Sequence, residues 1–169
     1  LLTVRNPVLQ PCMWKTPCDQ MTITLATSSD VGMITACVCA AYLPYITRMG
    51  RQPRPMLENY AEHVSQHLVY KATLATGLVG VIVLYETDDA LYVDNVAVDP
   101  LFKGLGIGKR LLSHAEAVAR SMGLRTLQLA TNVLMTENQA MYVHLGYVEV
   151  DRRQVGGYSS VCFRKTLVN

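Results

Sequence analysis

The stretch DPLFKGLGIGKRLL, residues 99–112, decides how the rest of the chain is interpreted. It follows a β-rich run, residues 91–98, which Pro100 ends because proline has no N–H group to donate to a β-ladder. Three glycines then alternate with two aliphatic residues, and a helical apolar pattern begins at about Gly106. Unpaired N–H groups at a helix start attract anions, and glycines let a ligand approach the backbone. The stretch therefore predicts a phosphate site, with an ordinary basic turn as the alternative.

Two common phosphate-binding motifs do not fit this loop. The dinucleotide motif G-x-G-x-x-G needs a third glycine, but reading from Gly104 gives Lys109 at that position and reading from Gly106 gives Leu111. The nucleoside triphosphate motif G-x-x-x-x-G-K-[ST] needs a hydroxyl residue after its lysine, where this chain has Arg110. A nucleotide-binding protein is therefore a weak interpretation.

Composition bounds the class of protein. The 169 residues, half of them hydrophobic, predict one globular domain, and the net charge of +2 predicts neither a nucleic acid nor a membrane surface as partner. The five cysteines cannot all pair, no basic segment followed by a long apolar run begins the sequence, and no run approaches the ~18 apolar residues of a membrane span. We therefore expect reduced cysteines and a cytoplasmic location.

A metal site is not expected from the histidines. His63 and His67 lie four residues apart, but the zinc-protease pattern needs a glutamate where the chain has Val64, and no third ligand is evident.

Periodicity along the chain predicts one α+β domain over residues 21–169, in the order β-α-α-β-β-β-α-β-α-β-β. Residues 1–20 contain three prolines and no clear period, which indicates an upstream extension or an N-terminal arm packed on the domain. Helices are predicted over 31–45, over 56–68, from Gly106 to about Met122, and from a Thr136 cap to Gly146. Strands are predicted over 21–26, 69–75, 78–85, 91–98 and 124–131, followed by two around residues 156–157.

Two motifs together resemble the Gcn5-related N-acetyltransferase (GNAT) family. NVAVDPLFKGLGIGKRLL, residues 95–112, resembles the family loop [R/Q]-x-x-G-x-[G/A] after a strand. Gly106 and Gly108 take the two small positions, and Lys103 replaces the usual arginine or glutamine. TENQAMYVHLGYVEV, residues 136–150, resembles the family segment N-x-x-A-x-x-Y-x-x-x-G-[F/Y], with closer spacing between Asn138 and Tyr142. The resemblance covers residues 21–167 and is specific to the family, not to a substrate.

The resemblance implies a mixed, mostly antiparallel sheet of about seven strands, splayed between the fourth and fifth and flanked by about four helices. It also implies acetyl-CoA as co-substrate and no metal. The pantetheine arm is expected in the splay, bonded to the backbone of Val96, Ala97 and Val98 and touched by Asn138. The pyrophosphate is expected on the loop formed by Lys103, Gly104, Leu105, Gly106, Ile107, Gly108 and Lys109.

The family places a tyrosine on the later helix as proton donor, which is Tyr142 here. A phenol with a pKa of about 10 is protonated at neutral pH and can protonate a leaving thiolate, although a core aromatic is the alternative role. A backbone N–H near Val96–Val98 is expected to stabilise the carbonyl oxygen. Asp94 is the first candidate for the base, with Glu86 or Glu58 acting through water as alternatives, or a water chain alone.

The acceptor site is expected between the first two helices and the last hairpin, with Tyr42 and Glu58 as contact residues. Arginines at 48, 51 and 54 either hold an acceptor carboxylate or are solvated. The expected activity is acetyl transfer from acetyl-CoA to a primary amine by direct attack in a ternary complex. A small amine, an amino-acid-like acceptor and a peptide N-terminus stay open, and so does a longer acyl chain. The alternative is a non-catalytic acyl-CoA-binding sensor module. Family members often form dimers, so a homodimer is a further expectation.

Overall fold

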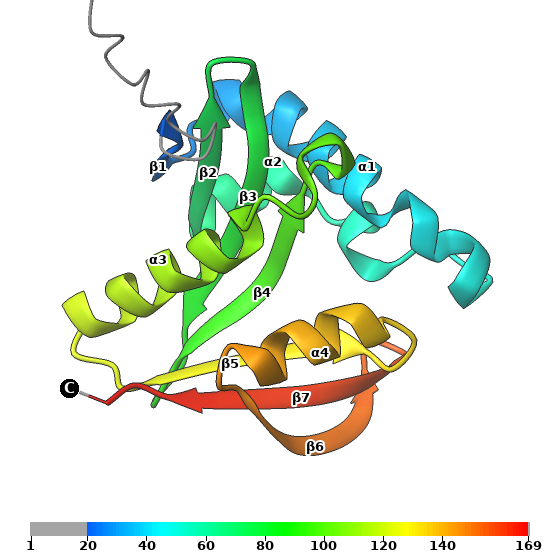
Figure 1. Ribbon diagram of the computed structural model, residues 1–169, viewed down its shortest axis with the longest axis vertical. Coiled ribbons are helices and arrows are strands. Elements are labelled where there is room, and N and C mark those ends of the chain that lie inside the picture. The colour runs from blue at the N-terminus through cyan, green and yellow to red at the C-terminus, as the bar shows by residue number, and fades with distance from the viewer. Residues whose placement is uncertain (1–19, 169) are drawn as a thin grey trace, which may run out of the picture.

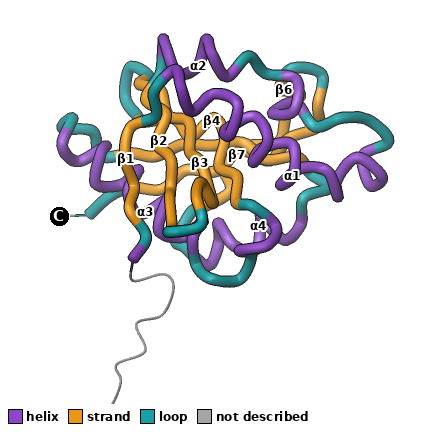
Figure 2. Tube along the Cα trace, turned by 90° about the horizontal axis from the view of Figure 1, so that it is seen from above, coloured by secondary structure: helices purple, strands orange, loops and turns teal. Residues whose placement is uncertain are grey.

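The computed structural model describes residues 20–168 and places them in one seven-stranded sheet with helices on both faces (Figures 1 and 2). The predicted element order is confirmed. The prediction of an extension over residues 1–20 lies outside the described residues, except for Gln20. The strands are β1 (Thr22–Leu25), β2 (Leu68–Leu74), β3 (Gly77–Glu86), β4 (Leu91–Val98), β5 (Thr126–Asn132), β6 (Val148–Val155) and β7 (Tyr158–Thr166). The helices are α1 (Val31–Met49), α2 (Tyr60–Gln66), α3 (Ile107–Ser121) and α4 (Thr136–His144).

The sheet is antiparallel except where β4 meets β5, in the order β1-β2-β3-β4-β5-β7-β6. The parallel pairing joins only Leu91–Val93 to Leu127–Leu129. β4 then continues to Val98 and β5 to Asn132 without pairing to each other, and Figure 1 shows the two strands diverging. The splay between the fourth and fifth strands, which the resemblance implies, is therefore confirmed.

The helix after the glycine loop, α3, packs closely on β3. Gly80 of β3 makes this possible, because a Cβ there would lie 3.1 Å from side-chain atoms of both Ile107 and Leu111 and 3.2 Å from the Ala97 carbonyl oxygen. The helix thus reaches the sheet at its first two turns, which fixes where its N-terminus points. Its buried stripe, at helical spacing, consists of Ile107, Leu111, Leu112, Ala115 and Ala119.

α1 and α2 cover the opposite face of the sheet through a second core. α1 is longer and more apolar than α2, and the segment Ser28–Met49 reaches a mean hydropathy of 1.3, enough to cross a membrane by length and composition alone. In this fold its inner side packs against β3 and β4, so it serves as a core helix. The fully or nearly fully buried residues of this core include Ile34, Val38, Tyr42, Tyr60, Val69, Val81, Val83 and Ala97.

Three predicted helix boundaries are wrong. α1 continues four residues past 45, because the residue that stops it is Gly50 in the left-handed region at φ 68°. The second helix begins at Tyr60 and not at 56, because the Asn59 side chain accepts hydrogen bonds from the first-turn amides of that helix. Thr136 is the first residue of α4 and not its cap; Met135 is the cap and makes no side-chain cap bond.

Replacing Gly80 with alanine should lower the free energy of unfolding by about 1–2 kcal/mol, because the new methyl group overpacks the contact between α3 and β3. Urea titration would measure it. Gly32→Ala is the matched control: nothing lies within 4 Å of a Cβ at this helical position, so stability should rise by up to about 1 kcal/mol. A Gly80→Ala protein as stable as the wild type would contradict the close packing.

Candidate active site

The outer edge of β4 is a row of backbone groups directed into the splay. The Asp99 N–H donates to the Val79 carbonyl at 3.0 Å, and Ala97 and Asn95 pair with Val81 and Val83 on the same strand. Hydrogen-bonded and non-bonded pairs alternate along an antiparallel ladder. The backbone N–H and C=O groups of Ala97 therefore face β3, whereas those of Val96 and Val98 face away from it. Val96 and Val98 therefore offer the edge that an extended amide chain can pair with, and Ala97 contributes its side chain.

The glycine loop leads directly into α3, and the Lys103 N–H at its start donates to the Pro100 carbonyl at 3.3 Å. Gly104 and Gly106 have φ of 82° and 75°, a region that strains residues with a Cβ, and Gly106 is the N-cap. The first intrahelical bond runs from the Arg110 N–H to the Gly106 carbonyl at 3.0 Å, so the amides before Arg110 precede the helical ladder. This geometry places positive partial charge at the helix end, as a pyrophosphate requires.

The loop and the β4 edge face one cavity of about 370 Å³ between α1 and α4. Leu105 is the one residue of the expected phosphate loop outside its lining. The lining consists of Ala41, Tyr42, Tyr45, Val96, Ala97, Val98, Phe102, Lys103, Gly104, Gly106, Ile107, Gly108, Lys109, Asn138, Met141, Tyr142, His144 and Leu145.

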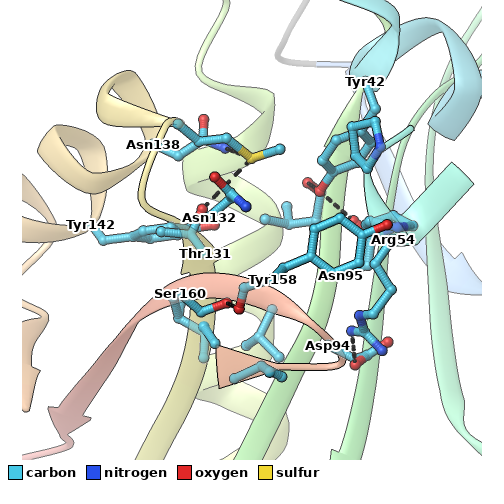
Figure 3. Close-up of a pocket in the computed structure, with 18 of the residues that line it drawn as sticks. Tyr42, Arg54, Asp94, Asn95, Thr131, Asn132, Asn138, Tyr142, Tyr158 and Ser160 are labelled. Atoms are coloured by element: carbon cyan, nitrogen blue, oxygen red, sulfur yellow. Dashed lines mark hydrogen bonds and ion pairs between the residues drawn. The ribbon is translucent and has the colours of Figure 1, made fainter. Parts of the chain in front are cut away.

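A second cavity of about 70 Å³ lies beyond the first, between β4, β5 and the β6–β7 hairpin. Asn138 and Tyr142 approach from α4, and Tyr42, Asn95 and Arg54 lie across from them (Figure 3). Four residues line both cavities: Tyr42, Val96, Asn138 and Tyr142. All four are site residues that the sequence analysis predicts: Tyr142 for catalysis, Val96 and Asn138 for the cofactor and Tyr42 for the acceptor.

Tyr142 is a buried phenol at this junction. It packs its ring against Tyr147, at 5.7 Å between centroids, and against Phe163. Burial raises the pKa of Tyr142 above its ordinary value of 10, and the nearby Tyr45 and Tyr92 raise it further. The phenol therefore stays protonated across the physiological range and can donate a proton.

Asn95 organises the α1 side of the site, and the sequence analysis missed it. The Tyr42 hydroxyl donates to Asn95 Oδ1 at 2.7 Å, and Asn95 Nδ2 donates to the Tyr60 hydroxyl at 2.9 Å. The Tyr60 hydroxyl donates in turn to the Pro55 carbonyl at 2.8 Å. Burial raises the pKa of Tyr42 and of Tyr60, so both hydroxyls stay protonated. The only sequence signal was an asparagine beside Asp94 in a strand whose other residues are hydrophobic.

Asp94 lies at a β-bulge on the wall of the smaller cavity. Leu84 pairs with Val93 and Val83 with Asn95, which leaves Asp94 as the extra residue of β4. Its carboxylate accepts from Arg54 Nη2 at 2.7 Å, and its side chain is 8% exposed.

Of the two predicted acceptor contacts, one lines the cavities and the other does not. Tyr42 lines both cavities, whereas Glu58 lines neither. Glu58 accepts from Arg54 Nη1 at 3.0 Å and lies 3.2 Å from His63 Nε2. Glu58 thus lies behind the arginine that lines the site.

Arg48 closes another side of the site. Both of its Nη atoms donate to Glu137 at 2.8 Å, which joins the end of α1 to the start of α4. This hydrogen bonding lowers the pKa of Glu137 to about 2. Arg48 is therefore 43% exposed but occupied by Glu137, and it is not free to bind an acceptor carboxylate. Within residues 20–168, no group of three histidine, cysteine, aspartate or glutamate side chains is placed to hold a metal ion.

Replacing Tyr60 with phenylalanine should lower the free energy of unfolding by about 1–3 kcal/mol, because it leaves the buried Asn95 amide without its acceptor. Thermal and urea unfolding would measure the loss. The matched control is Tyr85→Phe, since the partly exposed Tyr85 makes ring contacts with His67 and Tyr92, and we expect a change within about 0.5 kcal/mol. If both variants lost the same free energy of unfolding, the hydrogen bonds of Asn95 with Tyr42 and Tyr60 would not contribute to stability as predicted.

Comparisons with known proteins agree with this geometry. The PaiA N-acetyltransferase from Thermoplasma acidophilum, solved with coenzyme A, is 17% identical with a TM-score of 0.72, covering 86% of this chain and 98% of that one. A GNAT acetyltransferase from Elizabethkingia anophelis, solved with acetyl-CoA, is 19% identical with a TM-score of 0.66, covering 88% and 99%. The ribosomal-protein-S18-alanine N-acetyltransferase from Escherichia coli is 19% identical with a TM-score of 0.71, covering 87% and 94%.

Sequence comparison gives the family. A search of curated proteins finds no match. The sequence model of the acetyltransferase (GNAT) family, however, matches residues 39–147, well over half of the chain, and this span contains the splayed β4 edge, the glycine loop and Tyr142. The chain therefore belongs to the GNAT acetyltransferase family.

Proposed function

We propose that the protein is an acetyl-CoA-dependent N-acetyltransferase that acts on a primary amine of a small molecule or peptide by direct attack in a ternary complex. One observation carries the proposal: a large cavity with a phosphate-type loop and a smaller polar cavity meet at Tyr142, Asn138 and Val96. A donor and an acceptor held in the two cavities would meet there without a covalent enzyme intermediate.

The larger cavity suits the parts of acetyl-CoA. The amides at the start of α3, with Lys103 and Lys109 beside them, would hold the pyrophosphate. The outward backbone groups of Val96 and Val98 would pair with the pantetheine amides as an added strand does, in addition to the 3.4 Å bond from the Tyr42 hydroxyl to the Val96 carbonyl. Asn138 would bond the same arm from α4. When bound, acetyl-CoA supplies a thioester carbonyl that is open to attack by a neutral amine.

Three groups of the chain would share the chemistry. The outward N–H of Val96 or Val98 would donate to the carbonyl oxygen as negative charge develops on it. The Tyr142 phenol would give its proton to the leaving thiolate. Asp94, held by Arg54, would accept a proton from the nitrogen as the new N–C bond makes that nitrogen acidic.

Replacing Tyr142 with phenylalanine should lower kcat about 10²-fold or more, because the thiolate loses its proton donor. Binding should survive: acetyl-CoA at a hundredfold its Kd should stabilise both proteins by about 2.7 kcal/mol, whereas NAD and ATP should not. Thermal-shift titration and thiol release with an amine panel would measure the two effects.

Tyr147→Phe is the matched control for this experiment. Tyr147 is an adjacent buried phenol whose hydroxyl has no hydrogen-bond partner within the described part of the chain, so its loss should leave turnover unchanged. Stabilisation by acetyl-CoA with no turnover in the wild type would favour the sensor module over an enzyme. No stabilisation by acetyl-CoA would remove both functions.

Replacing Asp94 with asparagine should lower kcat about 10- to 100-fold. The loss is not larger because water can partly replace Asp94 as the proton acceptor. In both proteins kcat/KM should rise with pH as the amine loses its proton. No falling limb should appear below about pH 10, because burial holds the pKa of Tyr142 above its ordinary value.

Asp89→Asn removes an exposed carboxylate that pairs with Arg164 on the surface, and its rates should match the wild type. Wild-type rates in Asp94→Asn would exclude Asp94 as the base. A falling limb between pH 7 and 9 that disappears in Tyr142→Phe would contradict the protonated phenol.

A further inference from the structure

The two charged side chains that line the smaller cavity pair with each other. Among its described lining residues, the charged side chains are Asp94 and Arg54. They bind each other at 2.7 Å, and the second arm of Arg54 is taken by Glu58 at 3.0 Å. An acceptor carboxylate would therefore find no unpaired guanidinium, and a second ammonium would find no carboxylate beyond Asp94. Desolvating either extra charge without a partner is unfavourable.

The rest of the lining suits an uncharged body. Rings of Tyr42, Tyr92 and Tyr158 stand among aliphatic and thioether side chains, and hydroxyl and amide groups complete the wall. The volume is about 70 Å³, roughly half of the 150 Å³ known to hold a benzene molecule in an engineered apolar cavity. Only a few carbon atoms beside the amine fit without movement of the walls.

A clasp formed by Arg51, Gln52, Gly157 and Tyr158 joins the loop after α1 to the β6–β7 hairpin beside this cavity, which Tyr158 lines. Met49, Pro53 and Pro55 line the cavity, and so do Val155, Tyr158 and Ser160 of the β6–β7 hairpin. The Arg51 Nη2 donates to the Gly157 carbonyl at 2.6 Å, and the guanidinium carbon lies 3.6 Å from the centre of the Tyr158 ring. The Tyr158 hydroxyl donates to the Gln52 carbonyl at 2.8 Å, so three contacts join the two sides.

We infer that the acceptor is a compact primary monoamine with an uncharged carbon body, and that the Arg51–Tyr158 clasp sets its size limit. The inference rests on the proposed acetyl transfer and narrows its acceptor. It separates this acceptor class from polyamines, amino acids and peptide N-termini, each of which brings an extra charge or a bulk that a cavity of this lining and volume does not accommodate.

An acceptor panel matched in length tests the charge argument. The probes are butylamine, 1,4-diaminobutane and 4-aminobutanoate, assayed with acetyl-CoA at pH 9 and compared per neutral amine. Butylamine should have a kcat/KM at least about tenfold higher than the other two, because each of them places an unpaired charge in the cavity. Equal or better use of the diamine or the amino acid would overturn the inference.

The size argument needs an uncharged but larger acceptor, for which alanyl-glycyl-glycinamide serves. Per neutral amine, it should react at least about tenfold more slowly than butylamine. Rates are compared per neutral amine because its α-amino group, with a pKa near 8, is more often neutral at pH 9 than the amino group of butylamine. Replacing Arg51 with alanine should raise the tripeptide-to-butylamine ratio at least about fivefold. Arg153→Ala removes an equally exposed arginine of the same hairpin that pairs with Asp151, and it should leave the ratio unchanged.

The outcomes separate this inference from the proposed function. Acetylation of none of the four amines would overturn the proposed acetyl transfer, and the acceptor class would fall with it. Efficient acetylation of the tripeptide by the wild type, or an unchanged ratio in a folded Arg51→Ala protein, would overturn the acceptor class alone. Far-UV circular dichroism and the thermal midpoint would establish that the variant is folded.

Discussion

The site depends on a parallel pairing that lasts three residues. β4 and β5 are joined from Leu91 to Val93 and then part, which leaves the outward backbone groups of Val96 and Val98 without a neighbouring strand, with the Tyr42 hydroxyl donating to the Val96 carbonyl at 3.4 Å. Buried backbone groups are almost always satisfied, so such an edge needs a partner from outside the sheet. An extended amide chain is the natural partner. The same divergence also opens the space for the second cavity beyond it.

Long-range side-chain contacts hold the divergent halves in one arrangement. Asn95 joins α1 to α2 through two tyrosine hydroxyls, and Arg48 joins α1 to α4 through Glu137. Arg51 and Tyr158 join the loop after α1 to the last hairpin. These contacts surround the junction of the two cavities. Since β4 and β5 do not pair there, side-chain contacts join the elements on the two sides of the gap.

The sequence predicted the parts of the site whose conformation depends on neighbouring residues. The glycine loop and α3 follow from Gly104 and Gly106, whose conformations few other residues adopt, and from a helical apolar stripe. The strands could be predicted from the alternation of residues. The helix caps could not: Asn59 caps α2 and Thr136 does not cap α4, and several polar residues near each helix start could act as the cap. Asn95 could not be found, because its partners lie 53 and 35 residues away in the sequence.

Arg54 shows why acceptor chemistry is the hardest property to infer from sequence. An arginine near an acceptor site suggests either a carboxylate anchor or a solvated side chain, and its neighbours in sequence do not decide between them. In the fold its two arms pair with Asp94, forty residues later, and with Glu58. The guanidinium is then held in the wall of the smaller cavity. Donor binding relies on backbone groups that a short motif reveals, whereas acceptor choice relies on which side chains cancel one another. A family match can therefore predict donor binding among distant relatives, whereas acceptor choice must be worked out from the side chains of each protein.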